Sequence, residues 1–346
     1  MIGYAPIFEP LATRMPSSKQ LLGISNAIVD VLAHVDPSFI DEIGAVTGAM
    51  NLIDEGRARE IYDRMGPATE MSGGSVANTV AGFANLGGET AYIGHVHADQ
   101  LGSIFNHDMR SLGVDIRLQP ADDGAPTARS YILITPDGQR TMNTYLGSCL
   151  ELDTGDVTSA TVGTPKIALL EGYVWDIAEG PALTRKAMEI AAGVGAEVAL
   201  SLSDSFCVDR HRQSFLDAIQ DGAHIVIADE DEINALLQTD TFDDTLSALD
   251  DFSNLFVMTR SEKGSVIVHG DRTVVQPATP VEKVVDSTGA GDAYCAGFLY
   301  GWANGWTLEE SARLGTHCGT RVIQQLGARI EPGLLDSYSA ASSSGT

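Results

Sequence analysis

Basic residues are scarce in this sequence of 346 residues, which has 21 lysines and arginines against 47 aspartates and glutamates, a net charge of −26. A molecule of this charge is repelled by the phosphate backbone of nucleic acids and by anionic membrane surfaces. We therefore expect neither nucleic acid nor membrane among its partners. A small anionic ligand is not excluded, because a few backbone N–H groups or a Mg²⁺ ion can reverse the field locally.

Cysteine is also rare, and no two cysteines form a Cys-x-x-Cys pair. The four are Cys149, Cys207, Cys295 and Cys318. This spacing argues against a zinc ribbon or a disulfide framework, and it fits a reducing, cytoplasmic setting. The Gly-x-x-x-x-Gly-Lys-Ser/Thr string of a P-loop is absent as well, so nothing supports a P-loop phosphotransferase.

Long hydrophobic runs are missing. No segment approaches the roughly 18 uninterrupted apolar residues of a membrane span. Residues 1–20 contain Pro6, Glu9 and Pro16 instead of a basic start followed by an apolar run. We therefore predict a loose N-terminal leader and not a signal peptide. Residues 339–346 are small and polar, which predicts a disordered tail.

What the sequence does contain is an alternation of apolar, strand-like runs with amphipathic, helix-like segments, and 44% of its residues are hydrophobic. This pattern predicts an α/β fold with a mainly parallel sheet covered by helices on both faces. Helices are expected at 75–86 and from about residue 230. Strands are expected at 21–24, 197–202, 224–228 and 255–259, with a hairpin formed by 265–268 and 273–276.

Residues 129–145 break this rhythm, because two strand-like runs flank a Pro-Asp-Gly turn centred on Asp137. This is an antiparallel hairpin within a parallel-sheet protein. We expect it to form a small β-sheet lid, built from about residues 31–54 and 117–146 and inserted in a single domain that spans 21–338.

The sharpest motif is Asp-Ser-Thr-Gly-Ala-Gly-Asp at residues 286–292. Gly289, Ala290 and Gly291 place little side-chain bulk over backbone N–H groups at an expected helix N-terminus, where the helix dipole attracts an oxyanion. Asp292 in the first turn is placed to accept a proton from an attacking hydroxyl. The alternative is that Asp286 caps the helix and the glycines only turn the chain.

A second glycine turn opens the helix expected at 75–86. Gly73, Gly74 and Ser75 permit close approach of a ligand, and Asn78 offers a donor and an acceptor suited to a vicinal diol. Upstream, Asn26 and Asp30 follow the first strand. Ligands of open α/β sheets bind beyond the carboxyl ends of the strands, so both side chains are expected at the crevice. For Asp30 a loop cap is an equal alternative to a contact with two sugar hydroxyls.

Together these motifs, in this order and spacing from about residue 21 to 330, resemble the two signatures of ribokinase-like (pfkB-type) kinases. The resemblance implies a three-layer α/β sandwich with a β lid, and an enzyme that transfers the γ-phosphate of ATP to a primary hydroxyl. It implies that Asp292 is the catalytic base and that residues 289–291 form the anion hole. It also implies that Asp30, Gly74 and Asn78 hold sugar hydroxyls.

Within the family the residues fit the adenosine kinase branch most closely. Asn26 stands four residues before Asp30, and residues 202–206 read Leu-Ser-Asp-Ser-Phe. In that branch the purine lies between apolar and aromatic side chains, and Tyr173, Phe206 and Met142 occupy the matching places here. Ordinary core packing is the alternative for the two aromatic residues.

Arg140 stands at the second strand of the expected lid. It resembles the arginine that steadies the transferring phosphoryl group. A solvated arginine at a strand end is an equal alternative.

The resemblance also implies a nucleotide site and a metal site. The family's Asn-x-x-Glu element appears at 229–232 as Asp-Glu-Asp-Glu, so Glu232 fits as a residue that holds Mg²⁺ through water, while Asp229 replaces the usual asparagine. Asp286 and Ser287 mark a place where some relatives bind a monovalent cation such as K⁺, which the sequence leaves open. Further residues implied in ATP binding are Thr259, Gly264, Thr288 and His317.

The resulting hypothesis is an ATP-dependent kinase that converts a nucleoside, adenosine first, to its 5′-monophosphate. The alternatives are a kinase of the same family acting on ribose, fructose or a related sugar acid, and a catalytically silent nucleoside-binding sensor. The expected partner is therefore a small molecule. The sequence leaves monomer and homodimer open.

Overall fold

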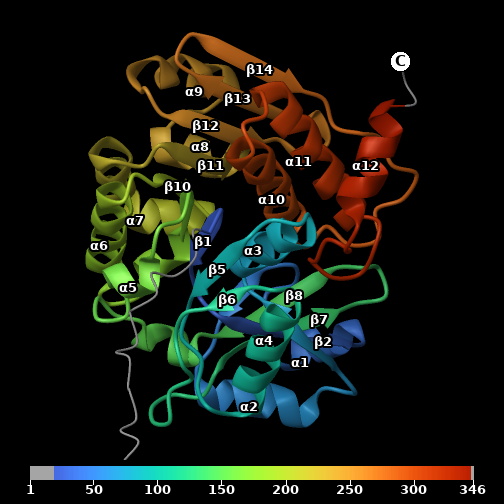
Figure 1. Ribbon diagram of the computed structural model, residues 1–346. Helices are drawn as coiled ribbons and strands as arrows, with labels where there is room; N and C mark the ends of the chain where they lie inside the picture. The colour runs from blue at the N-terminus through green and yellow to red at the C-terminus, as the bar shows by residue number, and fades with distance from the viewer. Residues whose placement is uncertain (1–18, 344–346) are drawn as a thin grey trace, which may run out of the picture.

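The computed structural model of the chain describes residues 19–343, and it is built around one large sheet and one small sheet (Figure 1). The large sheet has nine strands in the order β14-β13-β12-β11-β10-β9-β1-β5-β6. From β12 to β6 all neighbours run parallel, and β13 and β14 close one edge as an antiparallel hairpin. In chain order the strands are β1 (Leu21–Ile24), β5 (Thr90–Ile93), β6 (Asp115–Ile116), β9 (Ile167–Glu171), β10 (Glu197–Ser201), β11 (Ile225–Asp229), β12 (Leu255–Thr259), β13 (Ser265–His269) and β14 (Arg272–Gln276).

Helices cover both faces of this sheet, which confirms the predicted three-layer sandwich. Two separate apolar cores show the layers, because alternate residues of the strands belong to different cores: Leu21 of β1 packs with α3 and α10, while Leu22 packs with α6, α7 and α8. Strands buried on both faces read as continuous apolar runs, which is why the sequence revealed β1, β10, β11 and β12. Strands β5, β6 and β9 were not predicted. The helices are α1 (Pro37–Glu42), α2 (Glu55–Arg64), α3 (Ser75–Asn85), α4 (Gln100–Ser111), α5 (Ser159–Val162), α6 (Gly180–Gly193), α7 (Ser205–Asp221), α8 (Glu230–Leu237), α9 (Phe242–Ala248), α10 (Ala290–Ala303), α11 (Leu308–Val322) and α12 (Leu334–Ser343), with short 3₁₀ turns η1 (Gly147–Glu151), η2 (Gly172–Asp176), η3 (Leu249–Asp251) and η4 (Ser261–Lys263).

The small sheet is the lid, and its strands β8, β7 and β2 lie in the lower half of the view in Figure 1. Its order is β3-β8-β7-β2-β4, with β2 (Ile28–His34), β3 (Met50–Leu52), β4 (Thr69–Gly73), β7 (Ala128–Ile134) and β8 (Arg140–Tyr145). The predicted hairpin is present as β7 and β8, paired antiparallel. The sequence boundaries omitted β4, since this edge strand of mixed polarity is half exposed and lacks an apolar run.

The predictions for the two ends of the chain can be compared with the structure only in part. Residues 1–18 of the predicted leader and residues 344–346 of the predicted tail lie outside the described residues. Within the tail, 339–343 continue helix α12 instead of being irregular. No helix within the described part of the chain is both long enough and apolar enough to cross a bilayer.

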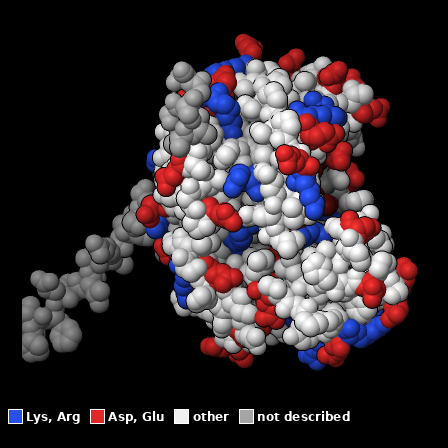
Figure 2. Space-filling view, turned by 90° about the vertical axis from the view of Figure 1, so that its right-hand side faces the viewer, with Lys and Arg blue, Asp and Glu red and all other residues white. Residues whose placement is uncertain are grey.

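Acidic and basic side chains are interspersed over the face of the molecule in Figure 2, so the negative charge of this face is not gathered in one patch. On this face the charge pattern therefore does not indicate a ligand site.

Candidate active site

A cavity of about 680 Å³ lies between the lid and the carboxyl edge of the large sheet. Lid residues line one wall, and the turns before helices α3 and α10 line the other. Most of the predicted site residues line it, although they come from distant parts of the sequence. These are Asn26, Asp30, Gly74, Ser75, Asn78, Arg140, Met142, Tyr173, Asp286, Ser287, Thr288, Gly289 and Asp292.

Asp292 lies in the first turn of α10, and two side chains of α3 hold its carboxylate. Ser75 Oγ donates to Oδ1 over 2.7 Å, and Asn78 Nδ2 donates to Oδ2 over 2.9 Å. Burial raises the pKa of Asp292 to about 6, against the opposing effect of these two hydrogen bonds. The carboxylate is thus oriented and ionised at neutral pH, as a general base must be.

The turn before α10 has the shape expected of an anion cradle. Gly289 is the N-cap, with φ +73°, and a Cβ there would collide with Ala328, so glycine is needed both for the backbone and for space. A Cβ added to Gly291 would meet nothing within 4 Å. The N-terminus of α10, beginning at Ala290, therefore offers backbone N–H groups with little bulk above them.

Asp286 does not cap α10, in contrast to the simpler reading of the motif. Its buried carboxylate accepts the N–H of Thr288 over 2.9 Å and that of Gly327 over 2.8 Å, so it ties the turn to the loop after α11. It also forms an ion pair with Arg140. In this structure the positive charge beside Asp286 is thus the lid arginine. The monovalent cation considered at Asp286 and Ser287 stays a prediction.

Arg140 is not a solvated arginine at a strand end, because its side chain is only 12% exposed. Its Nη1 is buried without a hydrogen-bond partner. A guanidinium placed at the cavity wall with a free donor is suited to an anionic ligand.

The residues expected at the sugar line the same cavity as Asp292. The Asp30 carboxylate of β2 packs against Gly73, where a Cβ would overlap it. Burial raises the pKa of Asp30 to about 7, Arg329 opposes this rise, and the nearby Asp292 adds to it. The amide oxygens of Asn26 and Asn78 are buried without a partner. Because unpaired buried acceptors are costly, these two atoms favour a ligand that brings hydroxyl donors.

Of the three residues expected around a purine, the structure places two at the cavity. Tyr173 of η2 and Met142 of β8 line it. Phe206 lies in the first turn of α7 and is 72% exposed, outside the cavity. The expectation for Phe206 is therefore not met in this structure, because the start of α7 turns this side chain to solvent.

Two ionisable residues beside the site escaped the sequence analysis, the buried Glu171 and the partly buried Arg329. Glu171, at the end of β9, is 1% exposed and accepts the N–H groups of Asn26 over 2.7 Å and Val76 over 3.5 Å. Burial raises the pKa of Glu171 to about 8. A carboxylate that ends the apolar run of β9 was a visible signal, because such a residue is rarely buried without partners.

The second is Arg329, in the loop after α11. It donates to the carbonyl oxygens of Ala77 and Ser72 and to Ser72 Oγ. Burial lowers its pKa to about 10. Arg329 thus fixes the turn that carries Gly73 and Gly74, and no pattern around it in the sequence indicates this long-range role.

Five of the residues expected at the nucleotide and metal do not line the cavity, whereas Asp286, Ser287 and Thr288 do. Asp229 and Glu232 form a reciprocal capping box at the start of α8. Thr259 ends β12, and Gly264 adopts φ +92° before β13. His317, within α11, packs against Tyr338, and burial lowers its pKa.

The chemistry of this region fits a hard divalent cation. Burial, and then the neighbouring Asp229, raise the pKa of Glu232 to about 8. Asp204 and Asp292 add to the rise. A cation relieves such repulsion between carboxylates, and Mg²⁺ prefers oxygen ligands and keeps several waters. Asp229 and Glu232 could hold it through water.

The sandwich, the lid and a carboxylate at a glycine-lined helix end define a small-molecule phosphotransferase of the ribokinase-like class. The family model of pfkB family carbohydrate kinases matches residues 40–333, and the chain belongs to this family. Enzymes of this kind phosphorylate a nucleoside or a sugar, and they use ATP and a divalent metal ion.

Three relatives show the range of substrates. The crystal structure of adenosine kinase from Sinorhizobium meliloti is 47% identical, with a TM-score of 0.88, and the match covers 94% of this chain and 100% of that one. A probable sugar kinase protein from Rhizobium etli CFN 42 is 44% identical, also with a TM-score of 0.88, over 94% of this chain and 98% of that one. A 5-dehydro-2-deoxygluconokinase of Lacticaseibacillus casei is 28% identical over 279 residues, 78% of this chain and 85% of that protein.

Proposed function

We propose that the protein transfers the γ-phosphate of ATP to the 5′ hydroxyl of a nucleoside, with adenosine as the preferred acceptor. The observation that carries this proposal is the position of Asp292. Its carboxylate is held by Ser75 and Asn78 in the same cavity as Asp30 and beside the N-terminus of α10. An acceptor hydroxyl, its base and an anion cradle can therefore meet at one place.

In the proposed mechanism Asp292 accepts the proton of the primary hydroxyl. The alkoxide oxygen forms a bond to the γ-phosphorus as the bond to the β-γ bridging oxygen breaks, and ADP leaves. The backbone amides at Gly289–Gly291 and the Arg140 guanidinium stabilise charge on the transferring group. Asp229 and Glu232 would hold a divalent metal ion through water, and that ion would neutralise charge on the phosphates.

The sugar is held by groups that match its hydroxyls. The Asp30 carboxylate accepts two of them, and the unpaired amide oxygens of Asn26 and Asn78 accept further donors. The purine packs against Tyr173 and Met142. Support for adenosine comes from this apolar and aromatic wall, together with the 47% identity to a protein described as adenosine kinase.

A sugar kinase is the second candidate, and a specific observation favours it. The Rhizobium etli relative, described as a probable sugar kinase, is nearly as similar, and Phe206 is missing from the purine wall. A single assay separates the candidates: the initial rate of ADP formation with adenosine, inosine, ribose, fructose or 5-dehydro-2-deoxygluconate, each with ATP and Mg²⁺. We expect the highest kcat/KM with adenosine. A higher kcat/KM with a sugar or sugar acid would show that this compound, and not a nucleoside, is the acceptor. If no acceptor were phosphorylated, a catalytically silent nucleoside sensor would be favoured.

A further inference from the structure

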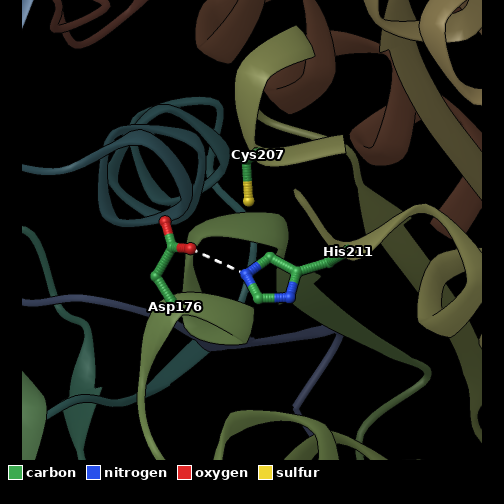
Figure 3. A group of neighbouring side chains, drawn as sticks. All are labelled: Asp176, Cys207 and His211. Atoms are coloured by element: carbon green, nitrogen blue, oxygen red, sulfur yellow. Dashed lines mark hydrogen bonds and ion pairs between the residues drawn. The ribbon is translucent and has the colours of Figure 1, made fainter. Parts of the chain in front are cut away.

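Asp176, Cys207 and His211 form a second cluster of chemically active side chains (Figure 3). Of the three, Asp176 lines the cavity. The cluster has one potential metal-ligand atom on each side chain, and these atoms all lie within 4.8 Å of one another. Asp176 ends η2, while Cys207 and His211 stand four residues apart on α7 and so share one face of the helix. The proposed phosphotransfer uses none of the three.

The local backbone brings the imidazole to the carboxylate. Helix α7 departs from helical geometry at His211, where φ is −121° and ψ is 16°. His211 Nε2 lies 2.7 Å from Asp176 Oδ1. Cys207, which is 0% exposed, lies with its thiol 3.4 Å from the carbonyl oxygen of Gly172. The two helical ligands and the η2 carboxylate thus converge from two separate elements.

We propose that Asp176, Cys207 and His211 form a binding site for a divalent transition metal of the Zn²⁺ class. One sulfur, one imidazole nitrogen and one carboxylate oxygen are the ligand types that Zn²⁺ takes, and they leave a fourth tetrahedral position for water. The ion replaces the hydrogen bond between His211 Nε2 and Asp176 Oδ1. The Cys207 thiol binds as thiolate, and its proton passes to solvent.

Arg210 stabilises this arrangement instead of preventing it. Its Nη2 donates to Asp176 Oδ2 over 2.6 Å, and its Nε to Oδ1 over 3.1 Å. When Oδ1 binds the ion, the shorter bond to Oδ2 remains and fixes the carboxylate, as hydrogen-bonded partners of ligating carboxylates do. The side chains of Asp176 and His211 are 19% and 25% exposed, so an ion can reach the buried sulfur past them.

The site adjoins the substrate cavity, because Asp176 lines that cavity together with Tyr173 of the same turn. A bound ion ties η2 to α7 at this wall. The cluster differs from the carboxylate site at Asp229 and Glu232 in position and in ligand chemistry. Its soft thiolate ligand favours Zn²⁺ over Mg²⁺.

The test uses Co²⁺ and Zn²⁺ on the full-length protein after treatment with a chelator and a reductant. Wild type should bind one Co²⁺ with a thiolate-to-metal charge-transfer band in the near ultraviolet, and Zn²⁺ should displace it. Cys207→Ser should abolish that band. His211→Gln should lower the affinity for Zn²⁺ by more than the roughly 10- to 100-fold typical of a residue that only supports a ligand. Competition with a chromophoric chelator measures this affinity.

Two further variants make the test decisive. Cys318→Ser removes another buried cysteine and should leave both the band and the affinity unchanged. Arg210→Gln should lower the affinity for Zn²⁺ by about tenfold and keep the charge-transfer band. Circular dichroism and thermal unfolding identify any variant that fails to fold. Absence of a thiolate band in wild type, or a Cys207→Ser protein that binds Zn²⁺ as tightly as wild type, would overturn the proposal.

Discussion

Arg140 of lid strand β8 forms an ion pair with Asp286, in the turn that leads into helix α10. The pair joins the lid to the anion cradle across the cavity. Its members come from the lid and from the glycine turn, which line two walls of the cavity. The guanidinium is already desolvated, and its Nη1 still lacks an acceptor. An anionic group at the cradle can supply that acceptor without a large movement of the lid.

We predict that Arg140→Gln lowers kcat by about 10²-fold, the usual effect of losing one donor to a developing anion. The dissociation constant of the nucleoside should change little, since the sugar-binding groups are untouched. Stopped-flow turnover and calorimetric nucleoside binding measure the two quantities. Arg59→Gln makes the same charge change on the exposed lid helix α2 and should have no effect. A large loss of nucleoside binding in Arg140→Gln would mean that the pair only holds the lid in place.

The pH dependence of kcat should report the carboxylate of Asp292. Its pKa of about 6 means that the base becomes protonated as the pH falls, so kcat should decrease below pH 6. Ser75→Ala removes a hydrogen bond that lowers this pKa, and the acid limb should move up by about 0.5 to 1 pH unit. Ser103→Ala, at an exposed hydroxyl of α4, is the control. An unmoved limb would assign the titration to another group.

The buried Glu171 should make the protein less stable as the pH rises. Its pKa is about 8 in the folded state against 4.5 for the free side chain, so between these values the unfolded chain releases a proton that the folded chain keeps. The free energy of unfolding should therefore fall by up to about 1.4 kcal/mol per pH unit from this group. Urea unfolding of wild type and Glu171→Gln from pH 5 to 8 tests this, with Glu262→Gln as an exposed control. Equal pH slopes in wild type and Glu171→Gln would contradict it.

Substitutions of Tyr173 and Phe206, the two aromatic residues expected at the purine, should affect the KM for adenosine differently. Tyr173→Ala should raise the KM for adenosine by about tenfold, as expected for the loss of one stacking surface. Phe206→Ala should stay within about twofold of wild type, because that side chain is 72% exposed and outside the cavity. Steady-state kinetics on both variants decide the matter. If Phe206→Ala lost as much as Tyr173→Ala, helix α7 would have to move on substrate binding.

Much of the fold could be predicted because burial leaves a clear mark on sequence. Strands such as β1 and β12 are apolar along almost their whole length, and Pro136 to Gly138 reveal the lid hairpin. Strand β4 could not be found in this way, since an edge strand of the lid needs few apolar residues.

The site was predictable where its chemistry is local. The glycines before α3 and α10 and the polar residues next to them act within one turn. The contacts of Glu171 and Arg329 were not predictable, since each depends on neighbours far away in the sequence. The exposure of Phe206 was missed for another reason. A motif gives the order of residues and not the direction in which a side chain points.

The most direct test is turnover and nucleoside binding in Asp292→Asn. The amide keeps the size of the side chain but cannot accept the hydroxyl proton, so kcat should fall by about 10² or more while adenosine still binds. Asp244→Asn makes the same change at the third residue of α9 and should alter neither kcat nor adenosine binding. Single-turnover phosphorylation and equilibrium dialysis measure both quantities. Full turnover in Asp292→Asn would contradict the assignment of Asp292 as the base.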